Sequence, residues 1–388
     1  MTKSTITIIG AGIGGLTLAL GLLRAGHKVA IFEQAPQLGE VGAGLSISPN
    51  AALGLDYLDM TGFMEDNSNI PLWQYTHHGE TDEVLIAIDR HPVREQYGAA
   101  YYQIHRADFH AELVRRIKAL DTDCIHLDHK LKALEKTDAG YTLRFTNGHE
   151  ENAIALVGAD GLRSVVRDML FMKDEPKFTG HMAWRALIPA GDLPDWYSDA
   201  ASHVWVGAGK SCVCYPVRGK NLVNFVGFAR ASAWVEEGWS VKAAPDEIRD
   251  TFAGWHKHPV DLMAAIPDET TYRWGLFARE PVETLAIGNA CLLGDAAHPM
   301  LPWFGQGASS SIEDGIVMAR CFEQTETPAD AFMRYDKARL ERVSFLQRES
   351  NLGGERLQAL DPYTLRDQPP KHEDALGIFR YNPVEVPV

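Results

Sequence analysis

The chain has 388 residues, of which 45% are hydrophobic and 23% charged, and its formal net charge is −15. This length exceeds what one hydrophobic core usually serves, so we expect two structural regions. The acidic balance argues against a nucleic-acid partner, and no apolar run reaches membrane-spanning length. Five scattered cysteines argue against a disulfide framework and a zinc site, so we expect no metal. The absence of an export signal at the start favours a cytoplasmic protein.

The first predicted element is a buried strand over residues 5–9, TITII, which leads into the sequence GAGIGG. Gly10, Gly12 and Gly15 supply the GxGxxG pattern of dinucleotide-binding folds. A helix with leucines at helical spacing follows, and a second strand, HKVAIFE, ends at Glu33. An acidic residue about 20 positions beyond the loop is what such a fold requires.

The glycines of this loop allow a tight turn, close approach to a pyrophosphate and close contact between helix and strand. The helix N-terminus offers unpaired N–H groups to phosphates, and Glu33 accepts hydrogen bonds from ribose hydroxyls. The same fingerprint fits NAD and FAD. A glycine-rich turn in another α/β unit is the alternative.

Two later strands also end in an aspartate. The strand IALVG precedes Asp160, and the strand CLL precedes Gly294 and Asp295. Carboxylates at the C-terminal ends of parallel strands face the ligand in such sheets, and two of them fit one long cofactor. Asp160 as a turn residue and Asp295 as a helix cap are the alternatives. The sequence FGQGA at residues 304–308 predicts a second helix N-terminus, suited to the negative charge of a reduced flavin.

The set GAGIGG, GAGLSISPNA, HRADFHAEL, GADGLRSVVR and GDAAHPMLPWFGQGA resembles the single-component FAD-dependent aromatic hydroxylases. The nearest branch is similar to salicylate hydroxylase and 6-hydroxynicotinate monooxygenase. The resemblance spans about residues 5–345 and implies an α/β (α+β) fold like that of para-hydroxybenzoate hydroxylase. In that fold a Rossmann-like FAD-binding domain carries an inserted antiparallel substrate sheet.

The resemblance implies that Asp295 contacts the flavin ribityl chain and that Arg106 contacts the phosphate and ribityl region. It implicates Asp160 and Gly161 in cofactor and NAD(P)H binding, and it places residues 41–46 along the flavin ring. Leu131 is a weaker candidate beside the adenine, with a plain core position as the alternative. The predicted FAD-binding residues are Gly10, Gly12, Gly14, Gly15, Glu33, Gln34, Val41, Gly42, Ala43, Arg106, Leu131, Asp160, Gly294, Asp295, Gly305, Gln306, Gly307 and Ala308.

The substrate pocket is predicted from fewer signals. Tyr215 is the catalytic candidate because a phenol can contact a hydroxylated ring, and a buried core tyrosine is the equal alternative. Along its strand, SCVCYPV, Cys214 lies on the opposite face, and only one face can point at the flavin. Trp303 either walls the substrate or packs on a sheet, and His298 is interpreted as structural. The resemblance implies ring-binding residues near Ser46, Cys214 and Trp303, where this sequence has small or apolar groups instead of the polar ones of a 6-hydroxynicotinate enzyme. The predicted substrate residues are Ser46, Cys214, Tyr215, Pro302 and Trp303.

The resemblance implies a discontinuous FAD domain, which we expect over residues 1–72, 98–180 and 276–355, with strands read as antiparallel inserted between its parts. The substrate-binding sheet takes residues 73–97 and 181–275, and residues 356–388 form a C-terminal tail that covers the surface or a partner subunit. Arg185, on this sheet, either steers a carboxylate or is a surface residue. No second GxGxxG is present, so NADH or NADPH is expected to bind transiently.

The resemblance implies tightly bound, non-covalent FAD that is reduced by NAD(P)H and reacts with O2. The resulting C4a-hydroperoxide hydroxylates a small aromatic or N-heteroaromatic ring, phenolic or carboxylated. The expected partner is this small aromatic molecule, with no nucleic acid and no membrane, and the chain is expected to be a monomer or homodimer. A non-oxygenating FAD oxidoreductase and a flavin-binding protein that captures a small molecule are the alternatives.

Overall fold

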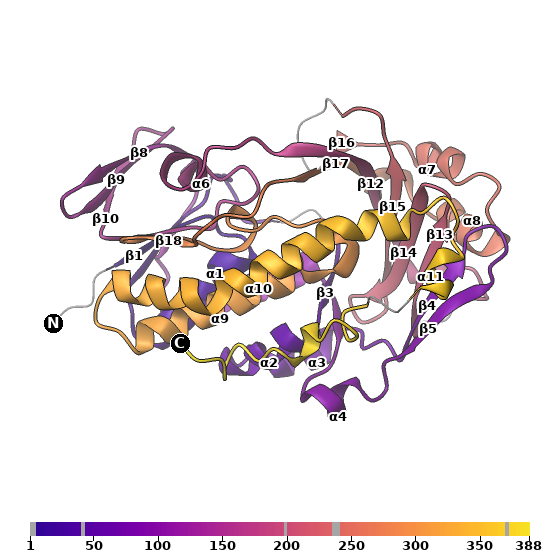
Figure 1. The fold of residues 1–388 in the computed structure, drawn as a ribbon, viewed down its shortest axis with the longest axis horizontal. Coiled ribbons are helices and arrows are strands. Elements are labelled where there is room, and N and C mark those ends of the chain that lie inside the picture. Colours follow the sequence, from indigo (N-terminus) through magenta and orange to yellow (C-terminus); the bar gives the residue numbers. More distant parts are fainter. Residues whose placement is uncertain (1–4, 40–42, 198–199, 235–240, 369–371) are drawn as a thin grey trace.

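The computed structural model describes residues 5–39, 43–197, 200–234, 241–368 and 372–388. Two sheets at opposite ends of an elongated molecule dominate the fold, and a long helix, α10 (Pro328–Leu357), runs from one toward the other (Figure 1). Between the two sheets lies a short antiparallel ribbon of β3 (Gly44–Ile47) and β6 (Tyr102–His105), which contacts elements on both sides. The predicted α/β fold class is confirmed.

The first sheet has six strands, and five of them run parallel. Its strands are near-continuous apolar runs, as expected for a sheet covered on both faces. Strands β2 and β7 lie on one side of β1, and the later strands β11 and β19 lie on its other side. The strand order therefore reverses between β1 and β11, and this switch point is where such sheets bind ligands. In spatial order the strands are β18 (Ala286–Ile287), β19 (Ala290–Leu292), β11 (Ala155–Gly158), β1 (Ile6–Ile9), β2 (Val29–Phe32) and β7 (Ile125–His126).

Three helices pack next to this sheet, and α1 contacts the other two. They are α1 (Ile13–Arg24), α5 (Arg106–Leu120) and α9 (Gln306–Glu323). Gly21 permits the close contact of α1 with α9, because a Cβ there would lie 2.8 Å from the Cβ of Ala319. The long helix α10 then packs against α9 and completes this layer (Figure 1).

The second sheet has eight strands in the described residues, and all neighbours are antiparallel except β13 and β4, which pair in parallel. The antiparallel substrate sheet that the sequence predicted is thus present, with one parallel pair added to it. The reason is that β4 comes from a distant segment, so no hairpin has to join it to β13. The strands in order are β16 (Val241–Lys242), β17 (Tyr272–Ala278), β12 (Lys177–Pro189), β15 (Leu222–Arg230), β14 (Lys210–Val217), β13 (Ala201–Gly207), β4 (Trp73–His78) and β5 (Val84–Asp89).

One face of the second sheet is covered by α7 (Pro245–Thr251) and α8 (Lys257–Ala264), whose apolar residues share a core with Trp184, Cys214 and Phe225.

Strands β12 and β17 run beyond the expected limits at 181 and 275. The domain bounds themselves stay a prediction. The remaining elements are β8 (Leu131–Thr137), β9 (Gly140–Phe145), β10 (Glu150–Ala153), α2 (Pro49–Tyr57), α3 (Thr61–Asn67), α4 (Val93–Tyr97), α6 (Val165–Leu170) and α11 (Thr364–Asp367).

The C-terminal tail folds back over its own chain. Ile378 and Phe379 are buried against Tyr97 and Tyr101, and Arg320 donates hydrogen bonds to carbonyls near the C-terminus. The tail thus covers the surface, the first of the two places expected for it.

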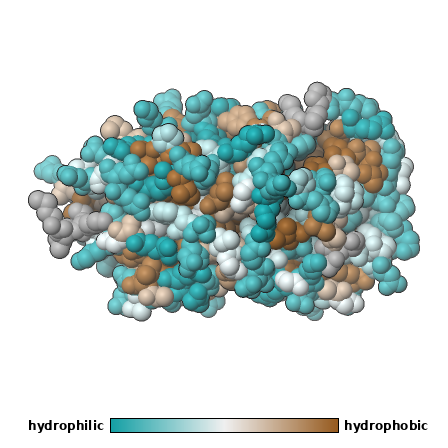
Figure 2. Space-filling view, turned by 90° about the horizontal axis from the view of Figure 1, so that it is seen from below, coloured by the Kyte–Doolittle hydropathy of each residue, from teal (hydrophilic) through white to brown (hydrophobic). Residues whose placement is uncertain are grey.

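The face seen in Figure 2 mixes hydrophilic and hydrophobic side chains, with the hydrophobic ones in separate patches. Among the described helices, none combines the length and apolar character needed to cross a membrane.

Candidate active site

A cavity of about 480 Å³ opens where three parallel strands end. Ile9, Gly158 and Leu292 lie side by side at the ends of β1, β11 and β19. The loops that follow these strands all contribute to the cavity wall. Its far side is formed by the second sheet and by β3, so the cavity joins the predicted dinucleotide site to the predicted substrate sheet. Its volume is in the range of small-molecule sites.

The glycines of the first loop divide into two kinds. A Cβ on Gly10 would lie 2.3 Å from the carbonyl oxygen of Ala159, and a Cβ on Gly15 would lie 2.3 Å from the carbonyl oxygen of Gly10. Both are therefore needed for close packing of helix and strands. A Cβ on Gly12, in contrast, would meet no atom within 4 Å, and Gly12 lines the cavity with Gly14. The open space beside Gly12 is where a bound group can approach the backbone.

Two helices begin at this cavity without a side-chain cap. The N-cap of α1 is Gly12 and that of α9 is Gly305, and neither helix has an acidic residue in its first turn. Gly307 and Ala308, in the first turn of α9, also line the cavity. Unpaired N–H groups at both helix starts are free to bind anionic groups such as a pyrophosphate. The residues present therefore fit a dinucleotide cofactor.

Asp295 lies in the loop after β19, and its exposed side chain opens onto the cavity with Gly294 and Arg106. Although the side chain is open to the cavity, the surrounding protein atoms keep bulk water from the Asp295 carboxyl and raise its pKa. The charges of His298 and Arg106 act in the opposite direction. No helix cap is formed by its side chain, so the alternative of a cap is not supported.

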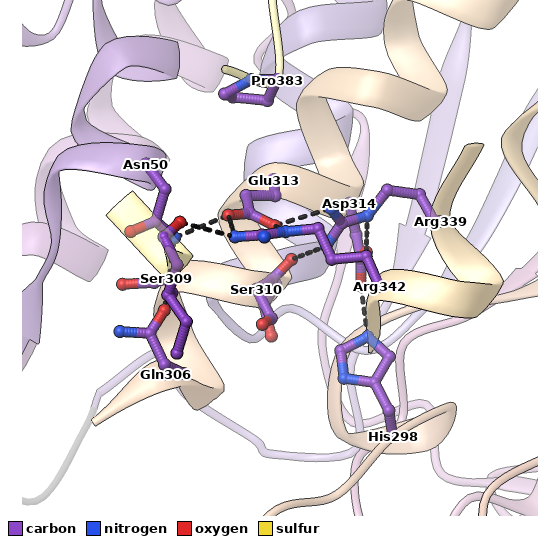
Figure 3. Close-up of polar contacts among 12 residues, drawn as sticks. Asn50, His298, Gln306, Ser309, Ser310, Glu313, Asp314, Arg339, Arg342 and Pro383 are labelled. Carbon is purple, nitrogen blue, oxygen red and sulfur yellow. Dashed lines mark hydrogen bonds and ion pairs between the residues drawn. The ribbon is translucent and has the colours of Figure 1, made fainter. Parts of the chain in front are cut away.

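A buried ion network holds the Asp295 loop in place (Figure 3). Asp314 of α9 accepts hydrogen bonds from the backbone N–H of Gly294 at 2.9 Å, from Nε2 of His298 at 2.6 Å and from Nε of Arg339 at 2.8 Å. Although burial opposes ionisation, His298 and Arg339 lower the pKa of Asp314. His298 is structural, as expected from the sequence.

A second acid, Glu313, extends this network on the same helix. It accepts hydrogen bonds from Asn50 at 2.6 Å and from Arg342 at 2.7 Å, and its carboxylate lies 2.6 Å from Arg339 (Figure 3). Asn50 is in α2, directly after the β3 segment that lines the cavity. The network therefore ties α2, α9 and α10 together around the site. The sequence carried no signal for it, because the partners Asn50, Arg339 and Arg342 lie far along the chain from the two acids.

The two other predicted carboxylates have local backbone partners. Glu33 accepts hydrogen bonds from the N–H groups of Ala11 at 2.8 Å and Ala35 at 2.9 Å, and it keeps lone pairs for further donors. Asp160 accepts from the N–H groups of Val165 and Val166 at the start of α6. Neither residue lines the cavity, and for Asp160 the geometry is that of a turn and helix-start residue.

Two phenols and one hydroxyl meet on the wall opposite the glycine loop. Tyr215 of β14, Tyr101 and Ser46 of β3 all line the cavity, and the Ser46 side chain interacts with both phenol groups. Burial raises the pKa of Tyr215 and raises that of Tyr101 to about 12. Both phenols are therefore protonated near neutral pH and can donate a hydrogen bond to a bound group. Gly44 lets β3 come this close, since a Cβ there would lie 2.6 Å from the Tyr215 ring.

Trp303 lines the cavity and also packs against the second sheet, and a contact with substrate stays a prediction. It lines the cavity after Pro302, and its ring packs against Phe228 at 4.8 Å between centroids and against the glycine pair of α10 at Gly353. Apolar side chains such as Phe228, Trp274 and Leu301 surround it, so this part of the cavity is largely apolar.

Several predicted residues lie elsewhere. Cys214 does not line the cavity; the alternation of side chains along β14 turns it into the core under α7 and α8. Leu131 is a core residue of the first layer, Gln306 is buried in hydrogen bonds with Ser48 and Asn50, and Gln34 is exposed away from the cavity. Val41 and Gly42 lie outside the described residues.

Some lining residues carried no local signal in the sequence. Gln74, Gln103 and Glu373 bring polar groups to the cavity from three distant segments, and Glu373 belongs to the C-terminal tail. Arg90 does not line the cavity, but its guanidinium lies 2.7 Å from Gln74 and 3.6 Å from Glu373 and so connects these two residues. Arg185, for which a surface position was the alternative, is buried and lines the cavity.

Comparison with known proteins decides the family. Residues 3–349 match the family model described as FAD binding domain. The chain belongs to this FAD-binding family. It is 36% identical to 3-amino-4-hydroxybenzoate 2-monooxygenase PtmB3 of Streptomyces platensis, over 91% of this chain and 88% of that protein. It is 33% identical to 6-hydroxynicotinate 3-monooxygenase of Pseudomonas fluorescens, over 89% of this chain and 90% of that protein.

Among solved structures, a salicylate hydroxylase substrate complex covers 98% of this chain with a TM-score of 0.83 at 25% identity, and 96% of that chain is matched. The expected relationship to the salicylate and 6-hydroxynicotinate hydroxylases is confirmed. This member of the family is an FAD-dependent aromatic-ring monooxygenase, and its cofactor is FAD.

Proposed function

We propose that the protein uses NADH or NADPH and O2 to hydroxylate a small aromatic or N-heteroaromatic substrate that carries a phenolic or carboxylate group. The observation that carries the proposal is the continuous cavity from the uncapped start of α1 to Tyr101 and Tyr215. When bound, FAD takes up hydride and supplies reduced flavin that activates O2 for transfer of one oxygen atom to the ring.

FAD would lie along one wall of this cavity and extend past it, around the start of α1, to Glu33. Its pyrophosphate fits the start of α1 beside Gly12, and a ribose fits Glu33, whose carboxylate already lies 2.8 Å from the N–H of Ala11 in the same loop. Asp295 and Arg106 would contact the chain between phosphate and ring. The start of α9 at Gly305 would face the flavin ring, where its N–H groups stabilise negative charge.

The substrate would lie between this ring and the second sheet. Tyr101 and Tyr215 are protonated and would donate hydrogen bonds to the negative oxygen of a phenolate, which is the electron-rich form that hydroxylation requires. Arg185 brings positive charge to the same wall, stacked against Tyr272 and Trp274 at 5.5 and 5.4 Å. It would favour a carboxylate. The apolar surroundings of Trp303 would keep water from the reacting ring.

Asp295→Asn is expected to weaken FAD binding about 10- to 100-fold, because a hydrogen bond to a charged acceptor contributes about 1.5–3 kcal/mol. The measurement is the FAD dissociation constant from quenching of flavin fluorescence. Asp268→Asn, at an exposed aspartate away from the cavity, serves as the control. Equal affinity in both variants would remove Asp295 from the FAD site.

Tyr215→Phe is expected to lower kcat/KM about 10-fold or more for a phenolic substrate, because the phenolate loses a donated hydrogen bond. FAD content and melting temperature should be unchanged. Tyr141→Phe is the matched control, since Tyr141 is a buried phenol outside the cavity. A Tyr215→Phe variant with wild-type kcat/KM would show that the phenol only fills space.

The reaction itself is tested by NAD(P)H consumption with a panel of hydroxylated aromatic and pyridine acids, together with the mass of each product. Each acid is paired with its analogue that lacks the carboxylate. The proposal expects consumption that depends on substrate and a product heavier by one oxygen atom. Consumption that yields only hydrogen peroxide for every compound would favour a non-oxygenating oxidoreductase.

A further inference from the structure

A cluster of histidines and one aspartate lies at the outer end of the second sheet, where β4, β5, β13 and α8 lie close together (Figure 1). Asp82 is in the turn between β4 and β5, His256 is the N-cap of α8, and His258 is in its first turn. None of these residues lines the active-site cavity. The cluster is therefore separate from the site of the proposed reaction.

The side chains of the cluster converge on one carboxylate oxygen. Oδ2 of Asp82 lies 2.6 Å from Nδ1 of His258 and 3.7 Å from Nδ1 of His256. One ligand atom from each of the three residues lies within 4.8 Å of the other two. A metal ion at this point could be coordinated by all three groups at once.

The surrounding residues fix the orientation of the two closest groups. Nε1 of Trp205 donates to Oδ1 of Asp82 at 2.8 Å, which leaves Oδ2 directed at the histidines. The His258 ring stacks on Trp196 with centroids 4.3 Å apart. Outer partners of this kind orient the ligands of metal sites. Nδ1 of His256 now accepts a long hydrogen bond of 3.3 Å from the N–H of His258, which coordination would replace.

The cluster is accessible to an ion from solvent. The side chains of His256 and His258 are each 35% exposed, and that of Asp82 is 17% exposed. Two imidazole nitrogens with one carboxylate oxygen suit Zn²⁺ and similar transition ions, whereas Ca²⁺ and Mg²⁺ prefer oxygen ligands alone. Three protein ligands leave a further position for water.

We propose that Asp82, His256 and His258 bind a divalent transition ion, with Zn²⁺ as the best match. The ion would join the β4–β5 turn to the start of α8, which covers the outer face of the second sheet. It would therefore stabilise this layer. The sequence led us to expect no metal because zinc sites were sought among cysteines, and this site contains none.

The test is calorimetric titration of the purified, metal-stripped full chain with Zn²⁺, with melting temperature as a second readout and Co²⁺ absorption as a third. The five cysteines are all buried, so thiols should not compete for the ion. The wild type is expected to bind Zn²⁺ and to melt at a higher temperature with it. Asp82→Asn and His258→Ala should each lower the affinity at least about 10-fold.

The variants are chosen to keep the fold. Asp82 has a left-handed backbone conformation with a φ of 61°, and asparagine tolerates this conformation. His91→Ala is the matched control, because His91 also lies 2.6 Å from an aspartate, Asp89, but no third ligand joins them within the described part of the chain. Equal Zn²⁺ binding by all the variants, or no binding by the wild type, would overturn the proposal. Neither result depends on FAD or on turnover.

Discussion

A valine at position 12 is expected to leave the protein folded and to abolish stable FAD binding. Gly12 has ordinary extended backbone angles, φ −74° and ψ 178°, and a Cβ there meets no atom within 4 Å. The side chain would instead fill the space that a pyrophosphate needs. Loss of two charge-assisted hydrogen bonds, at about 1.5 kcal/mol each, corresponds to at least about 100-fold weaker binding.

Gly10→Ala is the matched comparison, because it should impair folding rather than FAD binding alone. Gly10 has a φ of 106°, and its Cβ would lie 2.3 Å from the carbonyl oxygen of Ala159. This variant should be strongly destabilised or insoluble. Melting temperature and FAD affinity measured on both variants separate the two roles. A Gly12→Val variant with wild-type FAD affinity would place the phosphates elsewhere.

Asp314→Ala is expected to lower the free energy of unfolding by about 3–5 kcal/mol, as removal of one partner from a buried ion pair generally does. The substitution leaves Arg339 and His298 without their shared carboxylate and releases the N–H of Gly294. Because Gly294 precedes Asp295, FAD affinity should fall as well. Urea unfolding and flavin fluorescence measure the two effects.

Asp246→Asn is the control for Asp314, since it removes a similar Asp–Arg pair of 2.9 Å from the surface. Exposed pairs contribute only about 0–1 kcal/mol. An equally small effect of Asp314→Ala would show that the network does not support the fold.

Stability should also depend on pH through Asp314. Its pKa is lower in the folded protein than in the unfolded chain, so its carboxylate stabilises the fold at neutral pH. That contribution is lost progressively as the pH falls below about 4. The Asp314→Ala variant should lack this part of the acid dependence.

The cofactor side of the site was predictable from sequence because it is built from local patterns. The loop from Gly10 to Gly15 and the turn at Gly294 and Asp295 each follow directly from a strand, and parallel strands bring their ends together. The same reasoning predicted the helix start at Gly305. No local pattern distinguished Gly12, which is open, from Gly10, which is packed; that difference depends on Ala159, far along the chain.

The substrate side was less predictable because its residues come from distant segments. Alternation along β14 separated Cys214 from Tyr215, but it did not say which face meets the cavity. Tyr101 and Glu373 reach the cavity through contacts made only when the tail folds back over α4 and α10. Asp314 was missed for the same reason, since its partner Arg339 is on another helix.

The central claim is that FAD occupies the cavity between the starts of α1 and α9. Its most direct measurement is titration of the flavin-free protein with FAD, followed by absorption and by quenching of flavin fluorescence, for wild type and Gly12→Val side by side. The account predicts saturable, equimolar binding by the wild type and none by the folded variant in the same concentration range. A wild-type protein that stays colourless, or a variant that binds FAD equally well, would contradict it.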